Sequence, residues 1–121
     1  MKEILLVGVG GFIGAALRYI ASIWFPQFTR FGFPLGTFAV NFIGCTFLGI
    51  FVGLGLGKTT TLPLREFAVI GILGGFTTFS AFGLESFEIL QAGQFKMTVI
   101  YVLASIVLGI SGIGLGILIT R

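Results

Sequence analysis

The sequence predicts an all-α membrane protein in which residues 1–121 form a single domain of four transmembrane helices. The chain is 56% hydrophobic and only 9% charged, whereas a soluble domain has roughly a quarter of its residues charged. Uncharged runs cover residues 31–57, 67–84 and 97–120, and each is long enough to cross the hydrocarbon core of a bilayer. The chain contains neither His nor Asp, so it lacks the groups of an ordinary catalytic triad, and we expect no enzyme activity.

The limits of the four spans follow from local signals. Trp24 closes the first span as an interfacial aromatic anchor, and Pro34 suits the first turn of the second. Arg18 interrupts the position where a signal-peptide cleavage site would lie, so we expect the first span to remain on the chain. The predicted spans are residues 4–25, 34–56, 64–91 and 96–120.

The third span is too long to be one regular transmembrane helix. From about residue 64 to 91 it would measure roughly 42 Å, against a hydrocarbon core of about 30 Å. Its middle reads GGFTTFSAF, residues 74–82, and polar, helix-weakening residues at bilayer depth are tolerated only where they face protein or a cavity. Gly74-Gly75 followed by Thr77-Thr78 therefore predicts a helix broken near its middle, because glycines and β-branched residues form helices poorly.

The charges outside the spans indicate a weakly encoded orientation. They divide four to two between the predicted sides, with Lys2, Lys58, Arg65 and Arg121 on one side and Arg30 and Lys96 on the other. Such a split is a weak bias under the positive-inside rule, so both orientations are expected. Four short helices cannot surround much of a pore, so we expect a homodimer. If the two copies insert in opposite orientations, the homodimer is antiparallel and has dual topology. The basic residues are scattered singly, so we expect no nucleic-acid partner.

Glycines recur four residues apart along the predicted helices. Examples are Gly10/Gly14 and Gly112/Gly116. Small residues at this spacing let the backbones of two helices approach closely in lipid, and we expect most of these glycines to serve helix packing.

Neutral hydrogen-bond donors and one cation lie at bilayer depth, and these suit an anion. They are Arg18 in the first span, Thr37 and Asn41 in the second, Thr77, Thr78 and Ser80 in the third, and Tyr101 and Ser105 in the fourth. For Arg18 the choice lies between an interfacial, snorkelling arginine and a functional cation. We expect Glu85 and Glu88 to lie near the membrane surface or to be paired.

Phe79 and Phe82 are three residues apart, so they share one helix face. An aromatic ring has a positive edge, and two ring edges beside an amide can coordinate a small anion. The alternative is that both rings face lipid or pack in the protein, as most of the 15 phenylalanines do.

Three motifs resemble those of the Fluc (CrcB) family of fluoride channels. They are GGFIGAALRY at residues 10–19, GTFAVNFIG at residues 36–44 and GGFTTFSAF at residues 74–82, and the resemblance extends over the whole chain in length and helix count. The sequence departs from the family at Ala81, where Thr is usual, and at Cys45, where Ser is frequent.

The resemblance implies passive export of fluoride across the plasma membrane by an antiparallel, dual-topology homodimer with two pores. By resemblance, Asn41, Phe79, Phe82, Tyr101 and Ser105 match pore residues, with Thr37 beside them, and Arg18 matches a vestibule arginine. Gly74 and Thr77 match positions whose backbone carbonyls hold a structural Na⁺ at the dimer centre. The implied partners are fluoride, a second copy of the chain and the lipid bilayer.

A small multidrug exporter is the alternative, because it is also a four-helix, dual-topology dimer. Such an exporter should carry a membrane-embedded carboxylate in its first helix to bind cations. The first span here has Arg18 instead.

Overall fold

The computed structural model describes residues 1–56 and 63–121, and Lys58 and most of the predicted turn after the second span lie outside them. Four helical stretches in the described part are long and apolar enough to cross a membrane. The elements are α1 (Lys2–Trp24), α2 (Leu35–Gly53), the π-helix η1 (Arg65–Leu73), α3 (Gly74–Phe76), α4 (Phe79–Gln91) and α5 (Phe95–Ile119).

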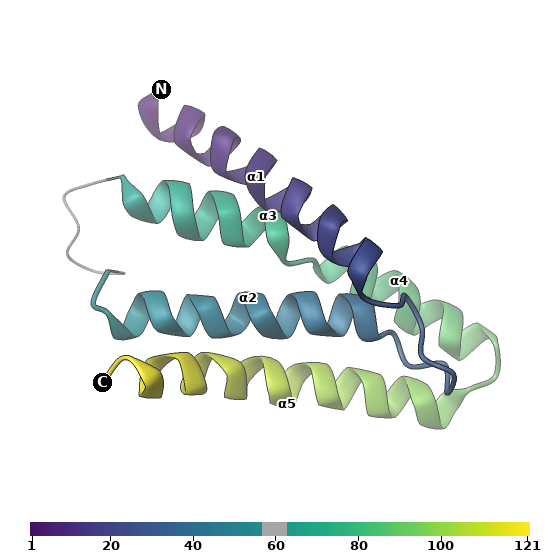
Figure 1. The fold of residues 1–121 in the computed structure, drawn as a ribbon. Helices are drawn as coiled ribbons and strands as arrows, with labels where there is room; N and C mark the ends of the chain where they lie inside the picture. Colours follow the sequence, from purple (N-terminus) through teal and green to yellow (C-terminus); the bar gives the residue numbers. More distant parts are fainter. Residues whose placement is uncertain (57–62) are drawn as a thin grey trace.

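The helices form two parallel pairs that run in opposite directions. The helices α2 and α5 lie side by side along their length, and α1 packs on η1 and α3. The helix α4 diverges from α1 and packs on the first part of α5 (Figure 1). Both chain termini lie at the same end of the bundle (Figure 1), as an even number of spans requires.

Glycines bring both helix pairs into backbone contact, which confirms the prediction from their spacing. A Cβ added at Gly10 or Gly14 of α1 would collide with backbone atoms of η1, those of Ile72 in the case of Gly14. A Cβ added at Gly49 of α2 would collide with the backbone of Ile113 in α5. These sites tolerate no side chain, so the glycines fix how closely the helices approach.

The third span departs from the predicted pattern in two ways. Gly74 and Gly75 lie inside the helical turn α3, and the residues with extended backbone are Thr77 and Thr78. The nine residues of η1 form a π-helix, a rare conformation for which the sequence carries no signal. In the second span, Pro34 precedes the first turn as the N-cap residue, one position before the place predicted for it.

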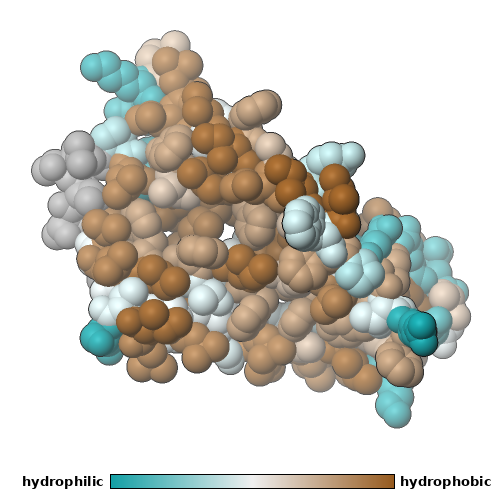
Figure 2. Space-filling view, in the orientation of Figure 1, coloured by the Kyte–Doolittle hydropathy of each residue, from teal (hydrophilic) through white to brown (hydrophobic). Residues whose placement is uncertain are grey.

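The protomer has very little apolar core of its own. Among the described residues, the buried hydrophobic side chains are those of Val40, Ile89 and Tyr101. Hydrophobic residues cover the middle of the molecule, and hydrophilic residues gather near its two ends (Figure 2). In a bilayer, lipid or another protein chain can cover such a surface without the penalty that water would impose.

Candidate functional site

The helical path of the third span is interrupted at Thr77 and Thr78. Thr77 has φ −80° and ψ 158°, and Thr78 has φ −149° and ψ 126°, so both are extended. The hydroxyl of Thr78 caps α4 by accepting a hydrogen bond of 3.2 Å from the amide of Ala81, as an N-cap threonine does. The hydroxyl of Thr77 turns back to the carbonyl oxygen of Leu73 at 2.9 Å.

Asn41 holds the peptide groups on both sides of Thr78. Its Nδ2 donates to the carbonyl oxygen of Thr78 at 2.9 Å, and its Oδ1 accepts from the amide of Thr78 at 2.8 Å. One side chain therefore replaces the two hydrogen bonds that a continuous helix would have given this residue. The sequence predicted a donor at Asn41, but not this bridge, because the rotation of α2 relative to the interruption cannot be read from spacing.

Arg18 reaches the same interruption from α1. Its Nη1 donates to the carbonyl oxygen of Thr77 at 3.2 Å, and the side chain is half-buried. Ser22, one turn further along α1, uses its hydroxyl on its own helix, at 2.6 Å from the carbonyl oxygen of Tyr19. Of these two residues of α1, Arg18 donates to the third span, and Ser22 donates within its own helix.

A buried carboxylate lies between α2, α4 and α5. Glu85 is 6% exposed, and its two oxygens accept hydrogen bonds from the hydroxyls of Thr37 at 2.6 Å and Tyr101 at 2.7 Å. Glu85 was expected either near the membrane surface or paired, and the structure shows that it is paired, with hydroxyls as the partners. A helix-face count could have signalled this, since Glu85 lies three residues after Phe82. Glu88, three residues further along α4, is exposed.

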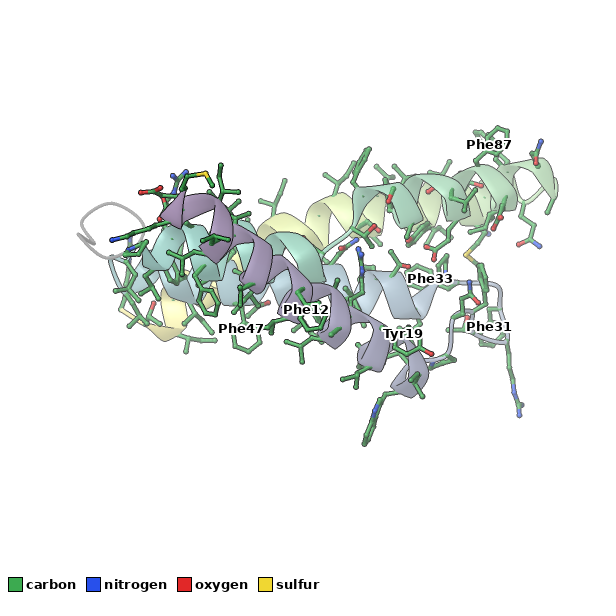
Figure 3. All side chains as sticks on the ribbon, turned by 90° about the horizontal axis from the view of Figure 1, so that it is seen from above. Phe12, Tyr19, Phe31, Phe33, Phe47 and Phe87 are labelled. Atoms are coloured by element: carbon green, nitrogen blue, oxygen red, sulfur yellow. The ribbon has the colours of Figure 1, made fainter. Side chains whose placement is uncertain are left out.

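Aromatic rings connect the interruption to this carboxylate. The ring centroids of Phe79 and Phe82 are 5.5 Å apart, and those of Phe82 and Tyr101 are 5.2 Å apart. Phe33 adds an edge-on contact with Tyr101 at 5.4 Å and lies between α2 and α4 in the view of Figure 3. Phe79 is 82% exposed, so in one protomer its ring has little cover.

Two grooves meet at this interruption. The first, here called the Ser105 groove, has a volume of about 470 Å³, and its lining includes Asn41, Cys45, Thr78, Phe79, Phe82 and Ser105. The second, here called the Arg18 groove, has a volume of about 450 Å³, and its lining includes Arg18, Ser22, Gln27, Thr37, Thr78 and Glu85. Thr78 lines both grooves, so its segment separates them.

Ser105 is the polar residue of α5 in its groove. Its Oγ is buried and has no hydrogen-bond partner among the described residues. A buried hydroxyl without a partner costs stability, and this one lies beside a groove that can hold a ligand.

Most of the residues predicted for the site lie around these two grooves, on α1, α2, α3, α4 and α5. Thr37 and Tyr101 meet at Glu85, and Asn41 and Arg18 meet at the interruption. Ser80 lies just inside α4, with its Oγ 3.2 Å from the Oγ of Thr78.

Comparisons of the sequence with known proteins assign nearly the whole chain to one family. Residues 5–117 match the family described as CrcB-like protein, Camphor Resistance (CrcB). A protein named fluoride-specific ion channel FluC from Azobacteroides pseudotrichonymphae is 44% identical over 123 residues, which cover 100% of this chain and 98% of that protein. Two proteins of the same name, from Phocaeicola vulgatus and Helicobacter pylori, are each 42% identical to this chain. The alignment with the first covers 97% of both chains. The alignment with the second covers 93% of this chain and 88% of the Helicobacter pylori protein. The chain is a multi-pass integral membrane protein, and it belongs to the CrcB-like protein family.

Proposed function

We propose that this chain is a passive, fluoride-selective channel of the plasma membrane that protects the cell from fluoride, and that it works as an antiparallel, dual-topology homodimer. The observation that carries the proposal is the set of hydrogen-bond donors around Thr78 between two grooves, in a chain 44% identical over its whole length to a protein named as a fluoride-specific channel. On this proposal the chain is a transporter and not an enzyme.

The chemistry of the site favours an anion. Asn41 has a second N–H besides the one bonded to Thr78, and the Oγ of Ser105 is buried without a partner in the part of the chain that the structure describes. The edges of the Phe79 and Phe82 rings carry partial positive charge, and Arg18 supplies a full positive charge near the other groove. A site with so few and so closely held donors favours a small, strongly hydrogen-bonding anion such as fluoride over the larger chloride.

Glu85 competes with an anion that passes through the Arg18 groove. Its carboxylate takes the hydroxyls of Thr37 and Tyr101, which are the donors an entering fluoride would use. Fluoride and the carboxylate therefore compete for the same two hydroxyls. Either hydroxyl can rotate about its C–O bond to serve one or the other acceptor.

A second copy of the chain completes the site in this proposal. Phe79 is 82% exposed and Gly74 is exposed as well, although both lie in the middle of the third span. The weak charge asymmetry of the predicted loops supports insertion in both orientations. An antiparallel partner brings the two interruptions together at bilayer depth and covers both.

The interruption also offers ligands for the proposed structural Na⁺. In a continuous helix the amide of Thr78 would reach the carbonyl oxygen of Gly74, but here it donates to Asn41. The amide of Ala81 would likewise reach the carbonyl oxygen of Thr77, but it donates to the hydroxyl of Thr78. Carbonyl oxygens released in this way suit Na⁺, and two protomers would supply four of them.

The multidrug-exporter alternative is not favoured. Its cation-binding carboxylate should lie within the first helix, and the acidic residue of α1 is Glu3, 3.4 Å from the N-terminal amine at the end of the helix. The relatives found here carry the name of a fluoride-specific channel.

Efflux from proteoliposomes tests the function. Purified protein is reconstituted in vesicles loaded with fluoride or chloride, with a potassium ionophore to balance charge and no imposed proton gradient. We expect rapid fluoride efflux and far slower chloride efflux, with protein-free vesicles as the control. Comparable chloride efflux would contradict the selectivity, and fluoride movement that needs a proton gradient would indicate a coupled exporter.

Thiol labelling tests the dual topology. Single cysteines replace Arg30 or Arg121, which lie on opposite predicted sides, in a Cys45→Ser background. A membrane-impermeant reagent should label about half of each variant from outside the cell if insertion occurs equally in both orientations. Complete labelling of one variant and none of the other would leave only a parallel assembly.

A further inference from the structure

Within the described residues, Arg18 is a cation without a carboxylate partner. Among the described residues, the ion pair found is between the N-terminal amine and Glu3, and both oxygens of Glu85, which lines the same groove, are taken by hydroxyls. The guanidinium instead donates to a neutral acceptor, the carbonyl oxygen of Thr77. A half-buried charge is costly in a membrane unless a polar group solvates it, and this carbonyl is the group that does so.

The same carbonyl is one of the two that the interruption releases. Its helical donor, the amide of Ala81, bonds to the hydroxyl of Thr78, so the guanidinium of Arg18 takes the place that the amide left. Na⁺ placed on this oxygen would lie within a few ångströms of a second positive charge. Two cations at that distance repel each other in a medium of low dielectric constant, so sharing the oxygen costs free energy.

We propose that Arg18 and Na⁺ compete for the carbonyl oxygen of Thr77. In the structure Arg18 solvates the carbonyl and is itself solvated by it. If Na⁺ took this oxygen, the guanidinium would give up the carbonyl, and its N–H donors would become available to an anion in the Arg18 groove, which Arg18 lines. Arg18 is thus a positioning residue that couples the cation at the interruption to the charge available in the groove. This inference rests on the sodium part of the proposed function.

Sodium titration of dimer stability tests the competition without measuring ion flux. The thermal midpoint of the purified dimer is followed as Na⁺ replaces N-methyl-D-glucamine at constant ionic strength. Arg18→Gln keeps donors for the carbonyl but removes the charge, Arg18→Lys keeps the charge, and Arg30→Gln removes an exposed charge from a loop. We expect Arg18→Gln to lower the Na⁺ concentration at half-effect at least tenfold, with Arg18→Lys and Arg30→Gln close to the unaltered protein.

An unchanged or raised half-effect concentration in Arg18→Gln would overturn the competition. Melting that ignores Na⁺ in every protein would overturn both the sodium site and this inference, while fluoride efflux would still test the channel separately. Should Arg18→Gln not assemble, the unaltered protein decides the question by NMR of its arginine side chains, with Arg18 assigned through Arg18→Lys. Saturating Na⁺ should shift the Nη signal of Arg18 and leave those of the other arginines in place, and an unmoved Arg18 signal would refute the proposal.

Discussion

The first half of the third span, η1 with α3, is held by contacts between backbones, whereas α4 in the second half is held by side chains. Glycines press η1 and α3 against α1 with no side chain between them. The helix α4 instead meets its neighbours through the hydroxyls on Glu85 and the ring contacts of Phe82, and the bridge of Asn41 lies just before its first turn. Close backbone packing resists displacement, while hydroxyls and rings can rotate. The first half therefore forms a fixed frame, and the second half carries the groups that can respond to an ion.

The largest effect, a loss of stability, is expected from adding a methyl group at Gly14, where α1 packs on the first half of the third span. In Gly14→Ala the new Cβ would overlap the backbone of Ile72 and lie 2.8 Å from the amide nitrogen of Phe76. Overpacking costs roughly 1–3 kcal/mol even where side chains can adjust, and here only backbone can move. We expect loss of the folded dimer in detergent, measured by size-exclusion chromatography and thermal melting.

Gly8→Ala is the matched control on the same helix. A Cβ at Gly8 meets nothing within 4 Å, so helix propensity should stabilise this variant by about 0.5–1 kcal/mol. Equal stability of the two variants would mean that the frame is not tightly packed.

A steep loss of fluoride flux is expected from a change at Asn41, whose bridge to Thr78 lies between the two halves of the third span. Asn41→Asp keeps the shape but removes both N–H donors, and its ionised form has no donor for the carbonyl oxygen of Thr78. A buried acceptor left unpaired costs about 1–3 kcal/mol. We expect fluoride efflux to fall at least about tenfold, since 1.4 kcal/mol corresponds to a factor of ten, and to fall further as pH rises and the new carboxyl ionises.

Thr46→Val on the same helix is the control, because the bond that the hydroxyl of Thr46 makes in the described part of the chain goes to the carbonyl oxygen of Phe42 within α2. If Asn41→Asp conducted like the unaltered protein at every pH, Asn41 would have no part in the path.

A smaller loss is expected at the rings. Phe82→Ile and Phe79→Ile keep the surface apolar but remove the positive ring edges. Fluoride efflux should fall in both, and more in Phe82→Ile, because Phe82 contacts both Phe79 and Tyr101. Phe87→Ile is the control on the same helix, since Phe87 is 56% exposed and points away from the other helices (Figure 3). Normal efflux from both test variants would make the rings packing residues.

The smallest effect is expected at Ser105, with opposite signs for stability and flux. Ser105→Ala removes a buried hydroxyl that has no partner among residues 1–56 and 63–121, so the free energy of unfolding should rise by up to about 1 kcal/mol. Fluoride efflux should fall a few-fold, because the groove loses a donor. Ser111→Ala, at an exposed position of α5, should change neither quantity. A loss of stability in Ser105→Ala would show that the hydroxyl has a partner in the dimer.

The sequence predicted the four spans and most of the polar residues around the grooves, because hydrophobic length and polar residues at bilayer depth are local signals. Partnerships between helices were not predictable. The bridge from Asn41 to Thr78 and the two hydroxyls on Glu85 depend on how each helix is rotated about its axis, and an apolar helix carries little information about that rotation. Helix propensity also misassigned Gly74 and Gly75 as part of the interruption, because tight packing on α1 keeps this turn helical.

The position of Thr78 between the two grooves, both of which it lines, affects where the transmembrane voltage falls. If water fills the two grooves in the membrane, each carries the potential of its own side inward, and the insulating layer between them narrows to the segment around Thr78. The transmembrane voltage then falls mainly across that short distance. Most of the electrical work of moving one fluoride ion across the membrane, about 2.3 kcal/mol for each 100 mV, would then be done in a single step past Thr78. The side chain of Asn41 holds the backbone in place at that point.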